Sequence, residues 1–259
     1  VKEMNMNLEE FSTLVLIKKD NHILSSYVKY NGELLDPRSE YRLIKNFGVK
    51  KEDIFWKYDC GTQTEAVKFQ RKAHLVLKLF YNSGEGDLYG IDENTVKTVF
   101  EIVKKYNDRD SMVKAYNLIY SKKKWNEYQE TEHGILYFMK DFTEDGKVYF
   151  KVGVTNEEKG AEGRLEELKR EHYLSEYAMV MDQFLFEKRS WTEYFEGLVH
   201  IFLSPNKISS PYRTQAKYGN KEDNFDECFD CDETQINIVR GYLISHNTPE
   251  KVIEQFKGN

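Results

Sequence analysis

The sequence predicts an α+β protein of two domains, 1–130 and 131–259. Runs rich in β-branched and aromatic residues, typical of strands, occur at 12–17, 22–28, 135–139, 148–154 and 179–186. Apolar residues recur at helical spacing in 64–81, 92–105, 110–122, 157–171 and 191–203. The polar stretch 126–133 follows a cluster of lysines and is the best place for a domain boundary. A length of 259 residues agrees with two domains of ordinary size.

The N-terminal part is expected to be a mixed domain of a hairpin and several helices. Asp20 and Asn21 separate the first two strand-like runs, so these runs are predicted to pair as a hairpin. A short helix is expected over 38–47. Asp92 and Asp110 are predicted to cap the second and third of the longer helices that follow.

The strand at 148–154 separates a core face from a second face. Val148, Phe150, Val152 and Val154 alternate with a second set of residues, so they form the core face. The second set is Tyr149, Lys151, Gly153 and Thr155. Tyr137, on the strand before, is expected beside Lys151 across the hairpin. Lys151 and Tyr137 are therefore candidate site residues.

The two helices that follow each carry an unusual charged residue. Thr155 with Glu158, and Ser190 with Glu193, have the spacing of a capping box. Arg164 borders the apolar stripe of the first helix and is expected to lean toward the sheet. Glu196 stands on a helix that is otherwise apolar, and His200 lies one turn further on.

Together these residues resemble the GIY-YIG nuclease superfamily. The resemblance is carried by four segments and covers about 95 of the 259 residues: Gly134-Ile135-Leu136-Tyr137, Tyr149-Phe150-Lys151-Val152-Gly153-Val154-Thr155, Arg164-Leu165, and Glu196-Gly197-Leu198-Val199-His200. It is closest to the phage and bacterial branch that has a lysine in place of the second signature tyrosine, and Glu227-Cys228-Phe229 is similar to the Glu-Phe-Phe that closes that branch. The chain departs from the signature by reading Ile-Leu-Tyr for Gly-Ile-Tyr and Lys-Val-Gly for Tyr-Ile-Gly.

The resemblance implies a small three-stranded antiparallel sheet flanked by helices, with a site that hydrolyses DNA phosphodiester bonds. Glu196 would be the sole protein ligand of one Mg²⁺ or Mn²⁺, a mode of binding that suits magnesium. Tyr137 would act as general base or proton relay, and nearby Lys151 would favour its phenolate. Arg164 would hold the scissile phosphate. Tyr149 and His200 would be second-shell or phosphate contacts.

Each of these residues also has a structural interpretation. Lys151 and Glu196 would be solvated surface residues, Arg164 a helix-surface salt bridge, Tyr137 a core residue and His200 a structural histidine. Cys228-x-x-Cys231 could be half of a zinc site, completed by Cys60, His246 or acidic residues.

Composition limits the class of protein. The net charge of −6 argues against a surface that binds nucleic acid through charge alone. The three cysteines suggest a reducing cytoplasm. No run is long and apolar enough to cross a membrane, and no signal peptide is visible. Acidic residues gather in 222–233.

The leading interpretation is a metal-dependent DNA endonuclease, with a restriction or phage-defence role favoured by the lysine-bearing branch. The N-terminal domain would supply target recognition, homodimerisation or both. Lys122, Lys123 and Lys124 are candidate phosphate contacts, together with Arg164. The alternatives are a catalytically silent module on the same fold, binding nucleic acid or a protein, and an acidic run at 222–233 that shields the basic site as a DNA mimic.

Overall fold

The computed structural model is an α+β protein, and it describes residues 13–31, 34–80, 88–106, 108–208, 211–212 and 227–246. The chain divides into two compact units, Val1–Ala115 and Tyr116–Asn259. The division falls inside α4 (Arg109–Tyr120), upstream of the boundary expected at 126–133. The expected domains therefore shift, because Tyr116 and Tyr120 pack on Tyr194 with ring centroids 5.6 and 4.6 Å apart.

The N-terminal unit is built on a four-stranded antiparallel sheet in the order β5-β1-β2-β6. The predicted hairpin is confirmed, and Asp20 takes the left-handed conformation in its turn, with φ 51°. The strands are β1 (Thr13–Lys19), β2 (His22–Val28), β3 (Tyr30–Asn31), β4 (Leu34–Leu35), β5 (Ile54–Asp59) and β6 (Leu88–Tyr89). The helices are α1 (Pro37–Phe47), η1 (Lys51–Asp53), α2 (Gln63–Val76), η2 (Lys78–Phe80) and α3 (Glu93–Tyr106).

Helices cover both faces of this sheet. Leu43 of α1 joins Val15 and Ile17 of β1 in one buried cluster. On the opposite face, Phe100 of α3 lies edge-on to Trp56 of β5, with ring centroids 5.4 Å apart. Both faces of β1 are buried, which explains its continuous apolar sequence.

The predicted N-cap is confirmed for α3 and wrong for α4. Asp92 caps α3 as expected, because its Oδ1 accepts the backbone N–H of Thr95 at 2.9 Å. The cap of α4 is Asp108 and not Asp110, since the Asp108 Oδ1 accepts from the Ser111 N–H at 2.7 Å.

The C-terminal unit contains a five-stranded antiparallel sheet in the order β10-β11-β8-β7-β9. The three strands predicted from alternation are β7, β8 and β9, while the short β10 and β11 extend the sheet beyond β8. The strands are β7 (Gly134–Phe142), β8 (Val148–Asn156), β9 (Met179–Phe186), β10 (Lys207–Ile208) and β11 (Cys228–Phe229). The helices are α5 (Glu127–Thr131), α6 (Gly160–Arg170), α7 (Arg189–Leu203), η3 (Ser204–Asn206) and α8 (Glu233–His246).

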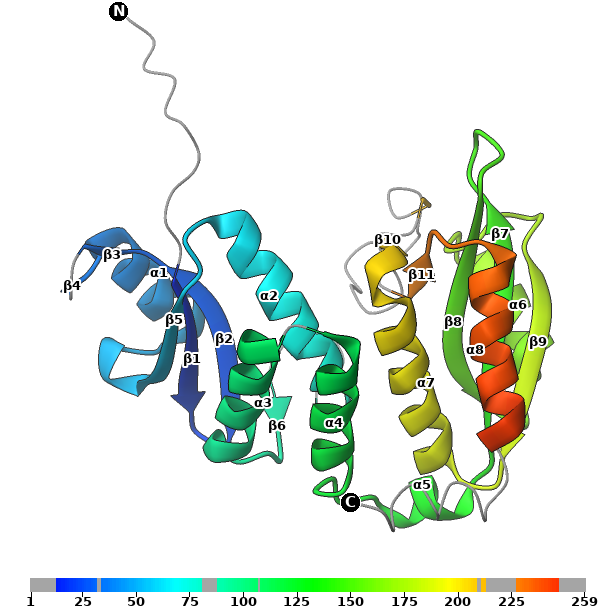
Figure 1. The fold of residues 1–259 in the computed structure, drawn as a ribbon, viewed down its shortest axis with the longest axis horizontal. Helices are drawn as coiled ribbons and strands as arrows, with labels where there is room; N and C mark the ends of the chain where they lie inside the picture. The colour runs from blue at the N-terminus through cyan, green and yellow to red at the C-terminus, as the bar shows by residue number, and fades with distance from the viewer. Residues whose placement is uncertain are drawn as a thin grey trace, which may run out of the picture. The chain divides into compact units, whose positions relative to one another are not determined.

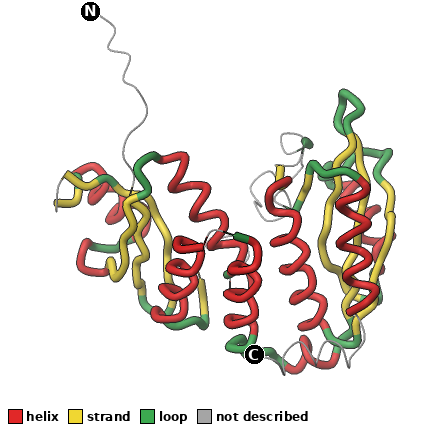
Figure 2. The backbone as a smooth tube through the Cα atoms, in the orientation of Figure 1, coloured by secondary structure: helices red, strands yellow, loops and turns green. Residues whose placement is uncertain are grey.

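This sheet also has helices on both faces (Figures 1 and 2). α6 packs on the face that carries Ile135, Tyr137 and Met139. α7 packs on the opposite face, where Phe195 stacks on Phe186 with centroids 5.0 Å apart. α8 lies on the same face as α7, because Arg240 bonds Asp182 at 2.6 Å, and Asp182 is the strand partner of Phe138.

Both predicted capping boxes in this unit are wrong. α6 begins at Gly160, and the turn before it is closed by Asn156, whose Oδ1 accepts from the Lys159 N–H at 3.0 Å. α7 begins at Arg189, so Ser190 lies inside the helix and Glu193 pairs with Arg189 at 3.4 Å. Thr155 and Glu193 therefore do not cap these helices.

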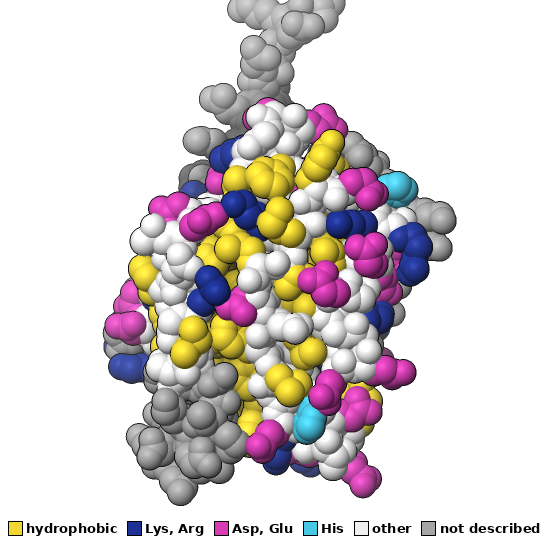
Figure 3. All heavy atoms as spheres, turned by 90° about the vertical axis from the view of Figure 1, so that its right-hand side faces the viewer, with side chains coloured by type: hydrophobic (Ala, Val, Ile, Leu, Met, Phe, Trp, Pro, Cys, Tyr) yellow, Lys and Arg dark blue, Asp and Glu magenta, His cyan; other side chains and the backbone are white. Residues whose placement is uncertain are grey.

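The surface of the C-terminal unit mixes charges of both signs. On the side of β9, acidic and basic side chains lie interspersed with hydrophobic ones (Figure 3). The exposed apolar side chains of β9 and α8 include Met179, Leu185, Ile238 and Ile244. Among the described residues, no helix combines the length and the apolar character that crossing a membrane requires.

Two glycines in helices test how tightly α7 packs. A Cβ on Gly197 would overlap the Tyr116 phenol, whereas a Cβ on Gly241 in α8 would meet no atom within 4 Å. We expect Gly197→Ala to lower the free energy of unfolding by about 1–3 kcal/mol, because the fully buried ring must move. Gly241→Ala should be neutral or stabilising by up to ~1 kcal/mol. Urea unfolding of the two variants measures this, and equal effects would show that the ring does not confine α7.

Candidate functional site

The pairing of β7 with β8 brings the predicted tyrosine and lysine onto one face of the sheet. Tyr137 lies directly opposite Gly153, and Lys151 lies opposite Met139. Side chains of directly paired residues share a face, so Tyr137 and Lys151 are diagonal neighbours there. α6 covers this face through Ala161. The expectation that the two residues share a face is therefore confirmed, although they are not directly opposite.

Gly153 makes room for two functional groups. A Cβ at this position would lie 2.5 Å from the Tyr137 Oη and 3.1 Å from the Glu227 Oε2. Any side chain would therefore displace the phenol or the carboxylate from the surface of the strand. This close approach explains why position 153 is a glycine.

Lys151 is a buried cation held by a carboxylate. Its side chain is 1% exposed, and its Nζ donates to the Glu227 Oε2 at 2.9 Å. Burial alone would lower the pKa of Lys151, but Glu227 and Tyr137 raise it, and the net pKa lies above the ordinary 10.5. The interpretation of Lys151 as a solvated strand residue is wrong.

Sequence reasoning did not include Glu227 among the site residues. It immediately precedes β11 and joins the site by pairing with Lys151, 76 residues away in the chain. The signal that could have found it was the resemblance of Glu227-Cys228-Phe229 to a motif of the nuclease branch. The backbone also fixes this segment, since the Glu227 carbonyl accepts from the Val152 N–H at 3.1 Å.

Arg164 forms a helix salt bridge and also approaches the sheet. Its Nη1 donates to the Glu167 Oε2 at 2.5 Å, one turn along α6, which is the expected helix salt bridge. It also hydrogen-bonds the Tyr137 phenol. Burial opposes its charge, but Tyr137 and Glu167 raise the pKa of the guanidinium. The prediction that Arg164 leans toward the sheet is confirmed.

The environment of Tyr137 changes the expected state of its phenol. Burial raises the pKa of Tyr137, and although Lys151 and Arg164 oppose this rise, they do not reverse it. The phenolate expected from the proximity of Lys151 is therefore not the form present at neutral pH in the unliganded protein. The side chain is 1% exposed, so it is also a core residue.

Glu196 and His200 belong to α7, on the face opposite Tyr137. Glu196 is 4% exposed, so its interpretation as a solvated helix residue is wrong. His200 is buried, its Nε2 lies 3.1 Å from the Val152 carbonyl, and its ring packs on Phe229. This is the arrangement of a structural histidine that fixes a helix to a strand. Neither residue is brought into the cluster of Tyr137, Lys151 and Arg164.

Tyr149 takes part in a separate buried network. Its phenol donates to the Asp141 Oδ2 at 2.5 Å, and the same oxygen accepts from the Ser175 N–H at 3.0 Å. Asp141 is fully buried, and these bonds satisfy its carboxylate. The expected second-shell role of Tyr149 is replaced here by a role in anchoring the turn around Ser175.

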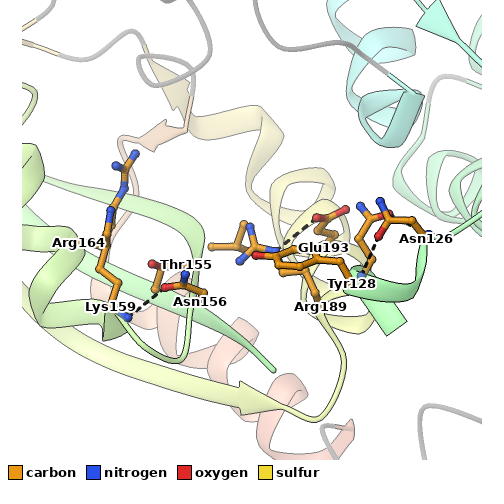
Figure 4. Close-up of a pocket in the computed structure, with 10 residues that line it drawn as sticks. Asn126, Tyr128, Thr155, Asn156, Lys159, Arg164, Arg189 and Glu193 are labelled. Atoms are coloured by element: carbon orange, nitrogen blue, oxygen red, sulfur yellow. Dashed lines mark hydrogen bonds and ion pairs between the residues drawn. The ribbon is translucent and has the colours of Figure 1, made fainter. Parts of the chain in front are cut away.

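A cavity of about 460 Å³ lies where the two helix-covered faces meet, at the end of β8. Figure 4 shows its two walls. One wall comes from β8 and α6, including Thr155 and Arg164, and the other comes from α5 and α7, including Glu193. Arg164 therefore belongs both to the cavity and to the buried cluster, and Glu193 brings a carboxylate of α7 to the same cavity, one turn before Glu196.

The lysines predicted to contact phosphates follow the end of α4. Lys122 and Lys124 are exposed. Lys123 is half-buried, and burial lowers its pKa, while Glu193 opposes the change. Two of the three side chains are therefore presented to solvent.

The zinc and DNA-mimic hypotheses depend on residues around β11. No group of three or more His, Cys, Asp or Glu side chains comes together within the described ranges, and the thiols of Cys228 and Cys231 are buried and reduced. Of the acidic run, 222–226 lie outside the described residues. Of the acids that are described, Glu227, Asp230 and Glu233 pair with lysines of the β7–β8 hairpin, whereas Asp232 accepts the Gln235 N–H at the start of α8.

Comparison of the chain with protein-family models, curated proteins and solved structures yields no match.

The buried ion pair gives a stability prediction. Glu227→Gln leaves the Lys151 ammonium buried without its carboxylate, so we expect a loss of about 3–5 kcal/mol in the free energy of unfolding. Because the pKa of Lys151 is raised, this contribution is fully present below pH 10.5 and is lost as the pH rises through the higher folded value. Urea unfolding at pH 7 measures the effect.

Asp230→Asn is the matched control. It breaks the pair with Lys147, whose side chain is 60% exposed, and should cost under about 1 kcal/mol. Equal losses for the two variants would contradict the view that burial makes the Glu227 pair special.

Proposed function

We propose that the C-terminal unit is a divalent-metal-dependent DNA endonuclease that hydrolyses phosphodiester bonds. The observation that carries the proposal is the convergence of Tyr137, Lys151 and Arg164 on one face of the sheet, with Glu227 beside them and the cavity at its rim. Phosphodiester hydrolysis develops negative charge on the phosphate, and a preformed cation beside a polar cavity stabilises that charge.

Arg164 is the residue of this cluster that meets the substrate in the proposal. It lines the cavity, while Tyr137 and Lys151 lie behind it. A guanidinium binds two phosphate oxygens at once, and Tyr137 and Glu167 fix its direction. Lys151 supports the cluster by keeping a positive charge next to the phenol.

The residues of the site can hold a magnesium or manganese ion only through a single protein carboxylate. Glu196 is the proposed ligand on the strength of the resemblance, which places the metal-binding glutamate at this position, and a single carboxylate with water and phosphate oxygens suits such an ion. When bound, such an ion polarises a phosphoryl oxygen and lowers the pKa of its water. Glu196 and the Tyr137 cluster lie on opposite faces of the sheet. A metal ion on Glu196 and the Arg164 guanidinium could therefore act on one phosphate only at the edge of the sheet, where the two faces meet.

Tyr137 is proposed to accept the proton of the attacking water, directly or through a relay. The raised pKa means that the neutral phenol predominates at pH 7. Its protonation state then sets how the rate depends on pH. The N-terminal unit would supply target recognition, homodimerisation or both. A restriction or phage-defence role remains the preferred context, on the strength of the lysine-bearing branch.

A second candidate function follows from burial. Tyr137 and Lys151 are each 1% exposed, and Lys151 is already paired with Glu227. A site closed in this way suits a catalytically silent module that binds nucleic acid or a protein. This alternative predicts binding without cleavage in Mg²⁺ or Mn²⁺.

Cleavage of plasmid and linear DNA with Mg²⁺ or Mn²⁺ tests the proposal. We expect the wild-type protein to cut, and Arg164→Ala to cut about 10²–10³-fold more slowly, because it loses the group that stabilises charge on the phosphate. Glu196→Gln should lose metal-dependent activity to a similar extent. Arg170→Ala on the exposed surface of α6, and Glu187→Gln before α7, are the controls and should cut normally. Undiminished cutting by Glu196→Gln would remove the metal ligand, and no cutting by the folded wild type would leave the silent module.

The raised pKa of Tyr137 predicts the pH dependence. If the phenol accepts a proton, kcat/KM should rise with pH from 6.5 to 9.5, because the ionised fraction grows about tenfold per unit below the pKa. Tyr137→Phe should be slower by roughly 10²–10⁴-fold and should lose the component of the rise that Tyr137 provides. A parallel rise in both proteins would assign the slope to another group.

A further inference from the structure

The cavity at the end of β8 differs in charge between its two walls. Lys159 and Arg164, on the α6 wall, share the single carboxylate of Glu167 at 2.7 and 2.5 Å. On the α7 wall, Arg189 is balanced by Glu193 at 3.4 Å. Among the described residues, the α6 wall therefore presents two cationic side chains with one carboxylate, and an anionic group is favoured there.

The other wall holds an exposed aromatic ring in a fixed place. Tyr128 of α5 lines the cavity and is 49% exposed. The Glu132 carboxylate raises the pKa of the Tyr128 phenol. In Figure 4 the ring lies beside Arg189, across the cavity from Lys159 and Arg164.

The short helix α5 is anchored at both ends, so this wall is preformed. Asn126 and Gln129 form a reciprocal capping box, with side-chain oxygens accepting backbone N–H groups at 2.9 and 3.3 Å. At the other end, the Arg189 N–H donates to the Glu132 carbonyl at 2.6 Å. The Lys188–Glu130 ion pair at 2.7 Å adds a second link to α7.

Side-chain amides complete the lining. Asn126, Gln129 and Asn156 all border the cavity. Their oxygens already accept backbone N–H groups, so their NH₂ groups are the ones that can donate to acceptors on a base edge. A volume of about 460 Å³ lies within the usual range of ~300–1,000 Å³ for sites that enclose one small ligand.

We propose that this cavity receives a single unstacked nucleotide of DNA, with its phosphate on the α6 wall at Arg164 and its base against Tyr128. A base stacks on an exposed aromatic ring whatever its identity. A base inside an intact duplex cannot reach such a ring, because it is already stacked and paired. The inference rests on the proposed function, since the phosphate is the one that Arg164 presents for hydrolysis. It makes the preferred substrate single-stranded DNA or duplex DNA with an extruded nucleotide.

Binding measured without cleavage tests the inference. The probes are a fluorescein-labelled 12-nucleotide single strand of mixed sequence and the corresponding 12-base-pair duplex, in EDTA, followed by fluorescence anisotropy. We expect the single strand to bind about tenfold or more tightly than the duplex. Tyr128→Ala should weaken single-strand binding by about tenfold or more, because an unpaired base can no longer stack on the ring. It should leave duplex binding unchanged, because paired bases do not reach the ring.

Three further variants control this result. Tyr128→Phe keeps the ring and should bind like the wild type. Tyr177→Ala removes a tyrosine that is 77% exposed and does not line the cavity, and it should have no effect. Arg164→Ala should weaken single-strand and duplex binding alike, because phosphate contacts carry no information on base stacking.

The outcomes separate this inference from the proposed function. Equal affinity for the two probes, or an unchanged affinity of Tyr128→Ala, overturns the nucleotide pocket while cleavage with Mg²⁺ still supports the nuclease. A preference for the single strand that depends on Tyr128, without cleavage in Mg²⁺ or Mn²⁺, supports the pocket and overturns the nuclease. Absence of binding to either probe overturns the pocket.

Discussion

The buried ion pair between Lys151 and Glu227 is the constraint on which the arrangement of the C-terminal unit depends. A lysine in the middle of a sheet is tolerated only with a carboxylate in contact, so the chain must return to β8 after α7 to supply one. Gly153 is the local requirement, because any side chain there would occupy the space of Glu227 and of the Tyr137 phenol. The burial of Lys151 therefore depends on three features together: the short strand β11, Gly153 and the ion pair with Glu227.

The sheet divides the predicted site residues between two environments. Tyr137 and Lys151 lie on the face that α6 covers with Arg164, while Glu196 and His200 belong to α7 on the opposite face. These faces meet only at the rim, where the end of β8 borders the cavity between α6 and α7. Arg164 lines that cavity, whereas Tyr137, Lys151, Glu196 and His200 do not.

The secondary structure of this protein can be predicted from its sequence more accurately than the contacts that its charged residues make. Alternation in 148–154 fixes which side chains of β8 share a face, because each face is buried against a different helix. Helix starts were missed where a cap comes from outside the expected pattern, as Asn156 and Asp108 show. Glu227 was missed as a site residue because its partner is 76 residues distant, and no local pattern reports such a pair. The state of Tyr137 was also missed, since proximity to Lys151 is visible in the sequence but the extent of burial is not.

Tyr137 and Lys151 are buried, whereas Arg164 reaches the cavity, so these residues differ in what they can contact. Arg164 lines the cavity and would meet a phosphate there under the proposed function, while Glu167 pairs with its guanidinium and Tyr137 lies beside it. The charge of Lys151 then acts through Tyr137 and not by direct contact with substrate. In this arrangement, Lys151 has a structural role of its own, as one half of a buried ion pair. It requires a carboxylate beside it, which Glu227 supplies at 2.9 Å, while the Arg164 guanidinium at the cavity is paired with Glu167.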